Sequence, residues 1–247
     1  MLIDTHCHIH ESDYPISSED AYSRAEKAGI KKLICVATNI QSSIDAISFA
    51  RTHKDVYASF GVHPHDTKNG YDLSVIDKSS KVVAVGEIGL DYYYNNSPKS
   101  VQRDALEYQI QIAIDYNLPI IFHVRSAFED FWPIFDNFRS ISGVLHSFTD
   151  NQANLDKALQ KGLYIGVNGI STFSKDKKQV DMISNIPIER LLLESDAPFL
   201  TPAPVRGKVN EPAYVSYIAE FQAKMRGISV EDVAITTSTN ANQLFKL

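Results

Sequence analysis

The chain has 247 residues, of which 44% are hydrophobic and 22% charged, and its formal net charge is −6 at pH 7. This composition excludes a disordered or fibrous protein, and the longest apolar runs, such as 118–122, are too short to span a membrane. The acidic balance also argues against a protein that grips duplex DNA along its length, because such proteins usually carry a basic stripe.

The cysteine content indicates a reducing compartment. Only Cys7 and Cys35 occur, and they form no Cys-x-x-Cys pair. The first predicted strand begins directly after Met1, which leaves no room for a signal peptide. We therefore expect a cytoplasmic protein, and no feature of the sequence indicates an obligate protein partner.

Short apolar strands alternate with helical segments from one end of the chain to the other. Strands are expected at residues 2–7, 32–37, 56–62, 82–87, 118–123, 143–146, 163–167 and 191–194. Helices are expected from Ser17 or Ser18 to Gly29, at 41–53, near 72–78, at 99–116, 127–138 and 151–161, and beyond 211.

This alternation favours parallel pairing of the strands. Eight strand–helix units in 247 residues predict an α/β protein, a single-domain TIM (β/α)8-type barrel over residues 1–247. The alternative is an open doubly wound sheet. That fold would place a glycine-rich turn after the first strand, whereas the first turn here is rich in histidine.

Side chains that can bind a metal lie at the carboxyl ends of five predicted strands. These residues are His6, His8, Glu87, His123, His146 and Asp196. In a barrel these strand ends converge on one mouth, where active sites lie. Any one of them could be an ordinary polar strand end, but their repetition indicates a metal site. Four imidazoles and two carboxylates suffice for two divalent ions (Mg, Mn or Zn), and one carboxylate could bridge them.

Five motifs occur in order along the chain. They are Asp4-Thr5-His6-Cys7-His8, Gly61-Val62-His63-Pro64-His65, Gly86-Glu87-Ile88-Gly89-Leu90-Asp91-Tyr92, Leu193-Glu194-Ser195-Asp196-Ala197-Pro198-Phe199-Leu200-Thr201-Pro202 and Arg206-Gly207-Lys208-Val209-Asn210-Glu211-Pro212. Together they resemble the signatures of the TatD family, metal-dependent deoxyribonucleases of the amidohydrolase-like barrel group.

The resemblance implies a role for each candidate ligand. His6, His8 and Asp196 would hold one metal, His123 and His146 the second, and Glu87 would bridge the two. Many members have His-Ser-Arg-Asp and His-Cys-Phe where this chain has His123-Val124-Arg125-Ser126 and His146-Ser147-Phe148. Both histidines are kept.

The expected activity is hydrolysis of phosphodiester bonds at an end of single-stranded DNA, or of RNA, by a water that the two metals activate. Asp196 is the expected general base and Glu87 the catalytic residue that sets the spacing of the metals. Substrate contacts are expected from His63, Asp91, Tyr92, Arg125 and Arg206. Arginine matches phosphate oxygens, a tyrosine can stack on a base, and His63 is expected to contact phosphate or water rather than a metal.

Other interpretations stay open from the sequence. The tyrosines could pack the barrel mouth, and the two arginines could form salt bridges at its rim. The same metal pair could hydrolyse a lactone, an amide or a phosphotriester, since a fold alone does not define a substrate. A non-catalytic metal-binding subunit is the remaining alternative.

Overall fold

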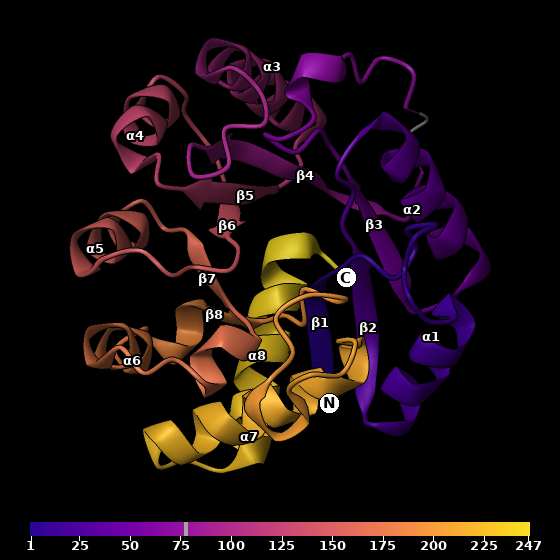
Figure 1. Cartoon of the computed structure of the whole chain (residues 1–247), viewed down its shortest axis with the longest axis vertical. Coiled ribbons are helices and arrows are strands. Elements are labelled where there is room, and N and C mark those ends of the chain that lie inside the picture. Colours follow the sequence, from indigo (N-terminus) through magenta and orange to yellow (C-terminus); the bar gives the residue numbers. More distant parts are fainter. Residues whose placement is uncertain (77–78) are drawn as a thin grey trace.

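The computed structural model describes residues 1–76 and 79–247, and in this part of the chain eight parallel strands form one sheet in the order β1 to β8. The strands are β1 (Leu2–Cys7), β2 (Ile30–Cys35), β3 (Val56–Phe60), β4 (Val82–Asp91), β5 (Ile120–Arg125), β6 (Gly143–Leu145), β7 (Tyr164–Val167) and β8 (Leu191–Leu193). Cys7 of β1 forms an isolated bridge with Ala197, which follows β8, so the sheet is a nearly closed barrel (Figure 1).

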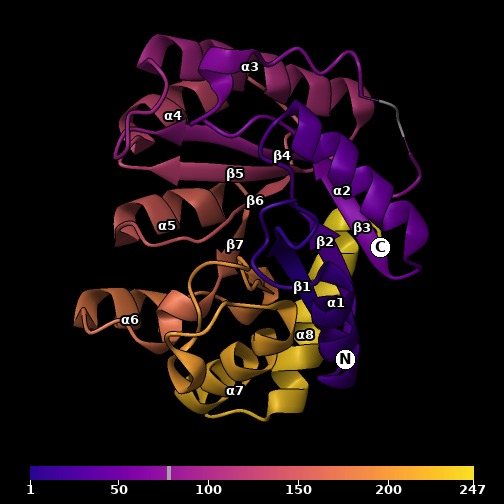
Figure 2. The same ribbon diagram turned by 45° about the vertical axis from the view of Figure 1, so that its right-hand side comes forward.

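Helices surround the strands. In the described residues they are α1 (Ser18–Lys27), α2 (Ile40–Thr52), α3 (Lys99–Tyr116), α4 (Phe128–Asp136), α5 (Gln152–Gln160), α6 (Lys177–Ser184), α7 (Val215–Arg226) and α8 (Val230–Phe245). Figure 2 shows α3, α4, α5 and α6 one below another along the outside of the barrel. None of the described helices is long and apolar enough to cross a membrane.

The predicted barrel is confirmed, and the differences lie in particular elements. Ser17 caps α1 as expected, since its side chain accepts a hydrogen bond from the backbone N–H of Asp20. The helix expected near 72–78 is absent from residues 72–76, while 77–78 lie outside the described residues. A short 3-10 helix lies earlier instead, at Thr67–Asn69.

Helix α6 is missing from the sequence-based prediction. It buries only Met182 and Ile183, so its apolar face is too narrow to give a clear helical pattern. Strand β4 is longer than expected. The register of its pairing with β5 shifts between Gly86 and Ile88, and the pairing then resumes and continues to Asp91.

The apolar side chains divide into an outer and an inner core. The outer core lies between the strands and the surrounding helices. The inner core fills the barrel with side chains such as Ile3, Ile121, Val144 and Leu192, and α8 adds Ala241, Leu244 and Phe245 to it.

Helix α8 closes the end of the barrel where the strands begin. Its Ser238 hydroxyl donates to the carbonyl oxygen of Met1 (2.8 Å), and its Asn240 amide donates to that of Leu191 (2.9 Å). Lys32, near the start of β2, donates to the side chain of Asn242 (3.0 Å). With this end covered, the barrel opens only where the strands end, which is the left side of the strands in Figure 2.

Replacing Phe245 with alanine is expected to lower the free energy of unfolding by about 3–5 kcal/mol, because the ring is 2% exposed and its loss leaves a cavity. Urea unfolding followed by circular dichroism measures this change. The matched control on the same helix is Ile235→Ala, where the side chain is 56% exposed and the change should stay within about 0.5 kcal/mol. Equal midpoints for the Phe245→Ala and Ile235→Ala proteins would show that α8 does not complete the inner core.

Candidate metal centre

The alternation of side chains along the strands places the candidate ligands inside the barrel mouth. Ile121 and Val144 belong to the inner core, and two residues further on His123 and His146 share their face. All the predicted metal ligands except His6 line a cavity of about 600 Å³ at the carboxyl ends of the strands. His6 is fully buried beneath it, with its ring stacked on that of His146 at 4.1 Å.

Glu87 is the centre of this cluster. Its Oε1 lies 2.7 Å from Nε2 of His146 and 2.8 Å from Nδ1 of His123. Its Oε2 lies 3.3 Å from Nε2 of His6 and 3.9 Å from Nε2 of His8. The two oxygens of one carboxylate therefore face two different pairs of imidazoles.

Asp196 completes the group around His6 and His8. Its Oδ1 lies 3.4 Å from Nε2 of His8 and 3.7 Å from Nε2 of His6. The residue has a φ of 57°, a left-handed conformation that aspartate tolerates better than most residues. Its backbone N–H donates to the carbonyl oxygen of His6 (2.8 Å), which ties the end of β8 to β1.

Gly89 allows β4 and β5 to come close enough for Glu87 to meet His123. It pairs with His123 in the β4–β5 ladder, and a Cβ at this position would overlap the carbonyl oxygen of His123. Only glycine fits there.

Hydrogen bonds on the far side of the rings fix which nitrogen faces the cluster. Nδ1 of His8 lies 2.8 Å from the carbonyl oxygen of Val36 and must donate to it, so Nε2 keeps its lone pair. Nε2 of His123 lies 3.0 Å from Asp91, which leaves Nδ1 free toward Glu87. Nδ1 of His146 has no close partner but faces Glu194 at 3.6 Å. Such carboxylate and carbonyl partners are typical of histidines that bind metals.

The buried cluster attracts positive charge. Burial opposes the charge of Glu87, but the neighbouring histidines hold the pKa of its carboxyl well below the usual range. Burial likewise opposes protonation of His146, but Glu87 and Glu194 raise the pKa of this imidazole well above its ordinary value. Buried charges need partners of this kind, and divalent cations would satisfy the carboxylates and the imidazole lone pairs together. The residues therefore fit a metal centre.

His63 differs from the other imidazoles. Its Nε2 is close enough to Glu87 and His123 to share an ion with them. Its Nδ1, however, accepts a hydrogen bond from the backbone N–H of His65 (3.1 Å). Neutral His63 must then carry its proton on Nε2, 3.7 Å from Oε1 of Glu87. Burial, together with His123, lowers the pKa of His63 well below its ordinary value, so this ring is a neutral donor.

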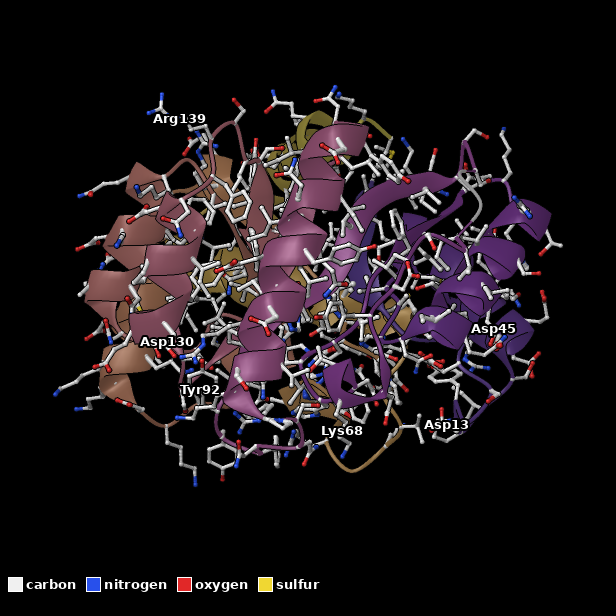
Figure 3. All side chains as sticks on the ribbon, turned by 90° about the horizontal axis from the view of Figure 1, so that it is seen from above. Asp13, Asp45, Lys68, Tyr92, Asp130 and Arg139 are labelled. Atoms are coloured by element: carbon white, nitrogen blue, oxygen red, sulfur yellow. The ribbon has the colours of Figure 1, made fainter. Side chains whose placement is uncertain are left out.

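The residues predicted to contact substrate separate into two groups. Asp91 and Arg125 line the cavity together with His63. Tyr92 and Arg206 do not. The Tyr92 hydroxyl donates to Asp130 (2.7 Å), a helix residue near the outer surface, as Figure 3 shows.

Arg206 is exposed and bound elsewhere. Its guanidinium donates to the carbonyl oxygen of Thr201 (3.1 Å) and lies over the Phe173 ring at 3.9 Å. Both carboxylate oxygens of Asp91 already accept hydrogen bonds. Oδ2 accepts them from the rings of His65 and His123, and Oδ1 from the backbone N–H groups of Tyr93 and Tyr94. Its observed contacts orient His123.

Residues that the sequence analysis did not single out hold the site from outside. Glu194 lies against His146 and accepts a hydrogen bond from the backbone N–H of Ser147 (2.6 Å). Two buried glutamines of α3 hydrogen-bond to backbone near the mouth. Gln102 pairs with the N–H and the carbonyl oxygen of Asp91, and Gln109 with those of Val62. Their spacing of seven residues places both glutamines on one face of the helix, and this pattern in the sequence indicates that they act together. For Glu194 the signal was its position two residues after Leu192.

The fold and the cluster define the class of the protein, a metal-dependent hydrolase built on a TIM barrel. Residues 3–246 match the family model described as TatD related DNase, and the chain belongs to this family.

Similar proteins cover the whole chain. It is 36% identical over 254 residues to an uncharacterized metal-dependent hydrolase, YabD, of Bacillus subtilis, with all of both chains covered. It is 33% identical to a 3′-5′ ssDNA/RNA exonuclease, TatD, of Salmonella typhimurium, over 100% of this chain and 99% of that one. Among solved structures, the TatD homologue YJJV of Escherichia coli has a TM-score of 0.90 at 29% identity, covering 100% of this chain and 98% of that chain.

Replacing Glu194 with glutamine is expected to weaken metal binding by about 10–100-fold, because His146 loses the charge that orients it and raises its basicity. Competition with a chromophoric chelator measures the affinity. Glu189→Gln, on the exposed surface before β8, is the control and should bind as the wild type does. If the folded Glu194→Gln protein bound metal as tightly as the wild type, Glu194 would not support metal binding through His146.

Proposed function

We propose that the whole chain, residues 1–247, acts as one hydrolase domain that trims the end of single-stranded DNA, or of RNA, with the help of two divalent ions (Mg, Mn or Zn). The observation that carries this proposal is Glu87, whose two oxygens face separate pairs of imidazoles. The Salmonella typhimurium relative is named a 3′-5′ ssDNA/RNA exonuclease, which supports the choice of substrate.

The orientation of the side chains supports two ion positions. His6, His8 and Asp196, with Oε2 of Glu87, would hold one ion. His123 and His146, with Oε1 of Glu87, would hold the second. Two ions bound there would supply Lewis-acid chemistry, polarising the phosphodiester and acidifying water. None of the described residues that line the cavity is a lysine, so a carboxylate is the available bridge.

Residues of the chain accept the proton and bind the phosphate. Asp196 is the proposed general base. Burial opposes its charge, but the neighbouring imidazoles, His8 above all, lower the pKa of its carboxyl, so the group is ionised and can accept a proton from water. His63 donates a hydrogen bond from Nε2–H to a phosphate oxygen and keeps its proton, since its Nδ1 accepts the backbone N–H of His65.

The shape and charge of the molecule favour the end of a single strand. The reacting groups lie in a pocket whose other end is closed by α8, so a phosphate must descend to reach them. A stiff duplex does not bend into a pocket cheaply, whereas a free strand end can enter one. The net charge of −6 also gives little attraction along a duplex.

Asp196→Asn is expected to lower kcat by about 10²–10⁴-fold, because the amide cannot accept the proton. Asparagine keeps the shape of the side chain, so the melting temperature should change little. Initial rates on a labelled single-stranded oligonucleotide, with Mg²⁺, Mn²⁺ or Zn²⁺, measure the effect. Asp181→Asn, on the exposed side of α6, is the control that should keep full activity. If Asp196→Asn protein retained the wild-type rate, another group would be the base.

Linear single-stranded DNA is expected to be degraded far faster than a covalently closed circle of the same sequence, since only the linear form offers an end. Both substrates are compared at equal nucleotide concentration, with and without a chelator. Metal-dependent degradation of the circle at the rate of the linear strand would show internal cleavage. In the same panel, turnover of a lactone, amide or phosphotriester without any turnover of nucleic acid would assign the site to another hydrolase.

A further inference from the structure

Two exposed aromatic side chains stand on opposite sides of the barrel mouth. Phe199 follows β8 and Tyr94 follows β4, and both line the cavity. In a ring of eight strands ordered β1 to β8, β4 and β8 are four strands apart in either direction, so their loops face each other across the mouth (Figure 1). The candidate metal ligands lie between them.

Phe199 is exposed although its backbone is firmly held. Its side chain is 60% exposed, while the other eleven phenylalanines, all in the described part of the chain, are buried or half-buried. The Asn210 amide donates to the carbonyl oxygen of Phe199, and the backbone N–H of Phe199 donates to that of Asp196 (2.8 Å). The ring lies 6.3 Å from that of His8, beside the His6–His8–Asp196 end of the site.

Tyr94 occupies the corresponding place at the other end. Its side chain is 55% exposed, and its backbone N–H donates to the buried Asp91 (3.1 Å). The ring lies 5.4 Å from that of His65, and the guanidinium of Arg125 lies 4.8 Å from its centre. This end of the mouth therefore presents an aromatic ring with a positive charge beside it.

We propose that Phe199 and Tyr94 are stacking platforms for the two bases that flank the scissile phosphate, so that the enzyme recognises a dinucleotide step with both bases unstacked from their neighbours. This inference rests on the proposed nuclease function. A phosphodiester held at Glu87 sends its two nucleosides in opposite directions, toward the two loops. Aromatic stacking accepts every base, because each base has a π face, and it requires that the strand be unpaired.

The test combines two variants with two modified substrates. Single-stranded oligonucleotides carry an abasic residue either on the 5′ side or on the 3′ side of the terminal phosphodiester, and kcat/KM is measured for wild type, Phe199→Ala and Tyr94→Ala. In the wild type, each abasic residue should lower kcat/KM by about 5- to 150-fold, the range expected for one stacked base. Each variant should abolish this penalty on one side only, and the two variants should act on different sides.

Further variants separate stacking from bulk. Phe199→Trp should keep the abasic penalty and Phe199→Leu should lose it, since leucine fills space without offering a π face. Ile235→Ala, which removes an exposed apolar side chain from α8 far from the mouth, is the control and should behave as the wild type does.

Three results would overturn the inference while leaving the nuclease in place. They are wild-type hydrolysis of DNA without an abasic penalty, both penalties retained in both variants, or one variant that abolishes both penalties. Failure of the wild type to hydrolyse any nucleic acid with any of the three metals would instead overturn the proposed function, and the platforms with it.

Discussion

The structure of this barrel mouth depends on the buried carboxylate of Glu87. A carboxylate that is 3% exposed stays ionised only among partners that favour its charge, and imidazoles face it from both sides. These imidazoles come from β1, β5 and β6, segments far apart in the chain that only a closed ring of strands brings together. The barrel is therefore what makes the charge of Glu87 tolerable, and the same arrangement gathers the groups that could hold a metal.

A second layer of polar contacts determines which atoms of the cluster are available. Val36 fixes the ring of His8, Asp91 fixes that of His123, and the backbone N–H of His65 occupies Nδ1 of His63. Asp91 is held in turn by Gln102 from α3. The helices thus do more than cover the sheet, since they determine the tautomers on which the chemistry depends.

The sequence predicted the barrel and the six candidate ligands because both follow from a period of two along short apolar strands. It could not predict where β4 ends, because the register irregularity at Glu87 depends on the pairing with β5. Strand β4 therefore continues to Asp91, and the chain turns so that Tyr94, rather than Tyr92, lines the cavity. The position of Arg206 depends on contacts with Thr201 and Phe173 that local sequence does not encode. Glu194 shares a face with Leu192, but its contact with His146, which gives it a role in the site, comes from the packing of β8 near β6.

We propose that Glu87 lies between two ions, and anomalous diffraction from crystals grown with Mn²⁺ or Zn²⁺ tests this arrangement. We expect two peaks about 3.5–4 Å apart, one beside each oxygen of Glu87. The first should contact His6, His8 and Asp196, and the second His123 and His146, with His63 bound to neither. A single peak, or a peak coordinated by His63 in place of His123, would show that Glu87 does not lie between two ions held by these ligands.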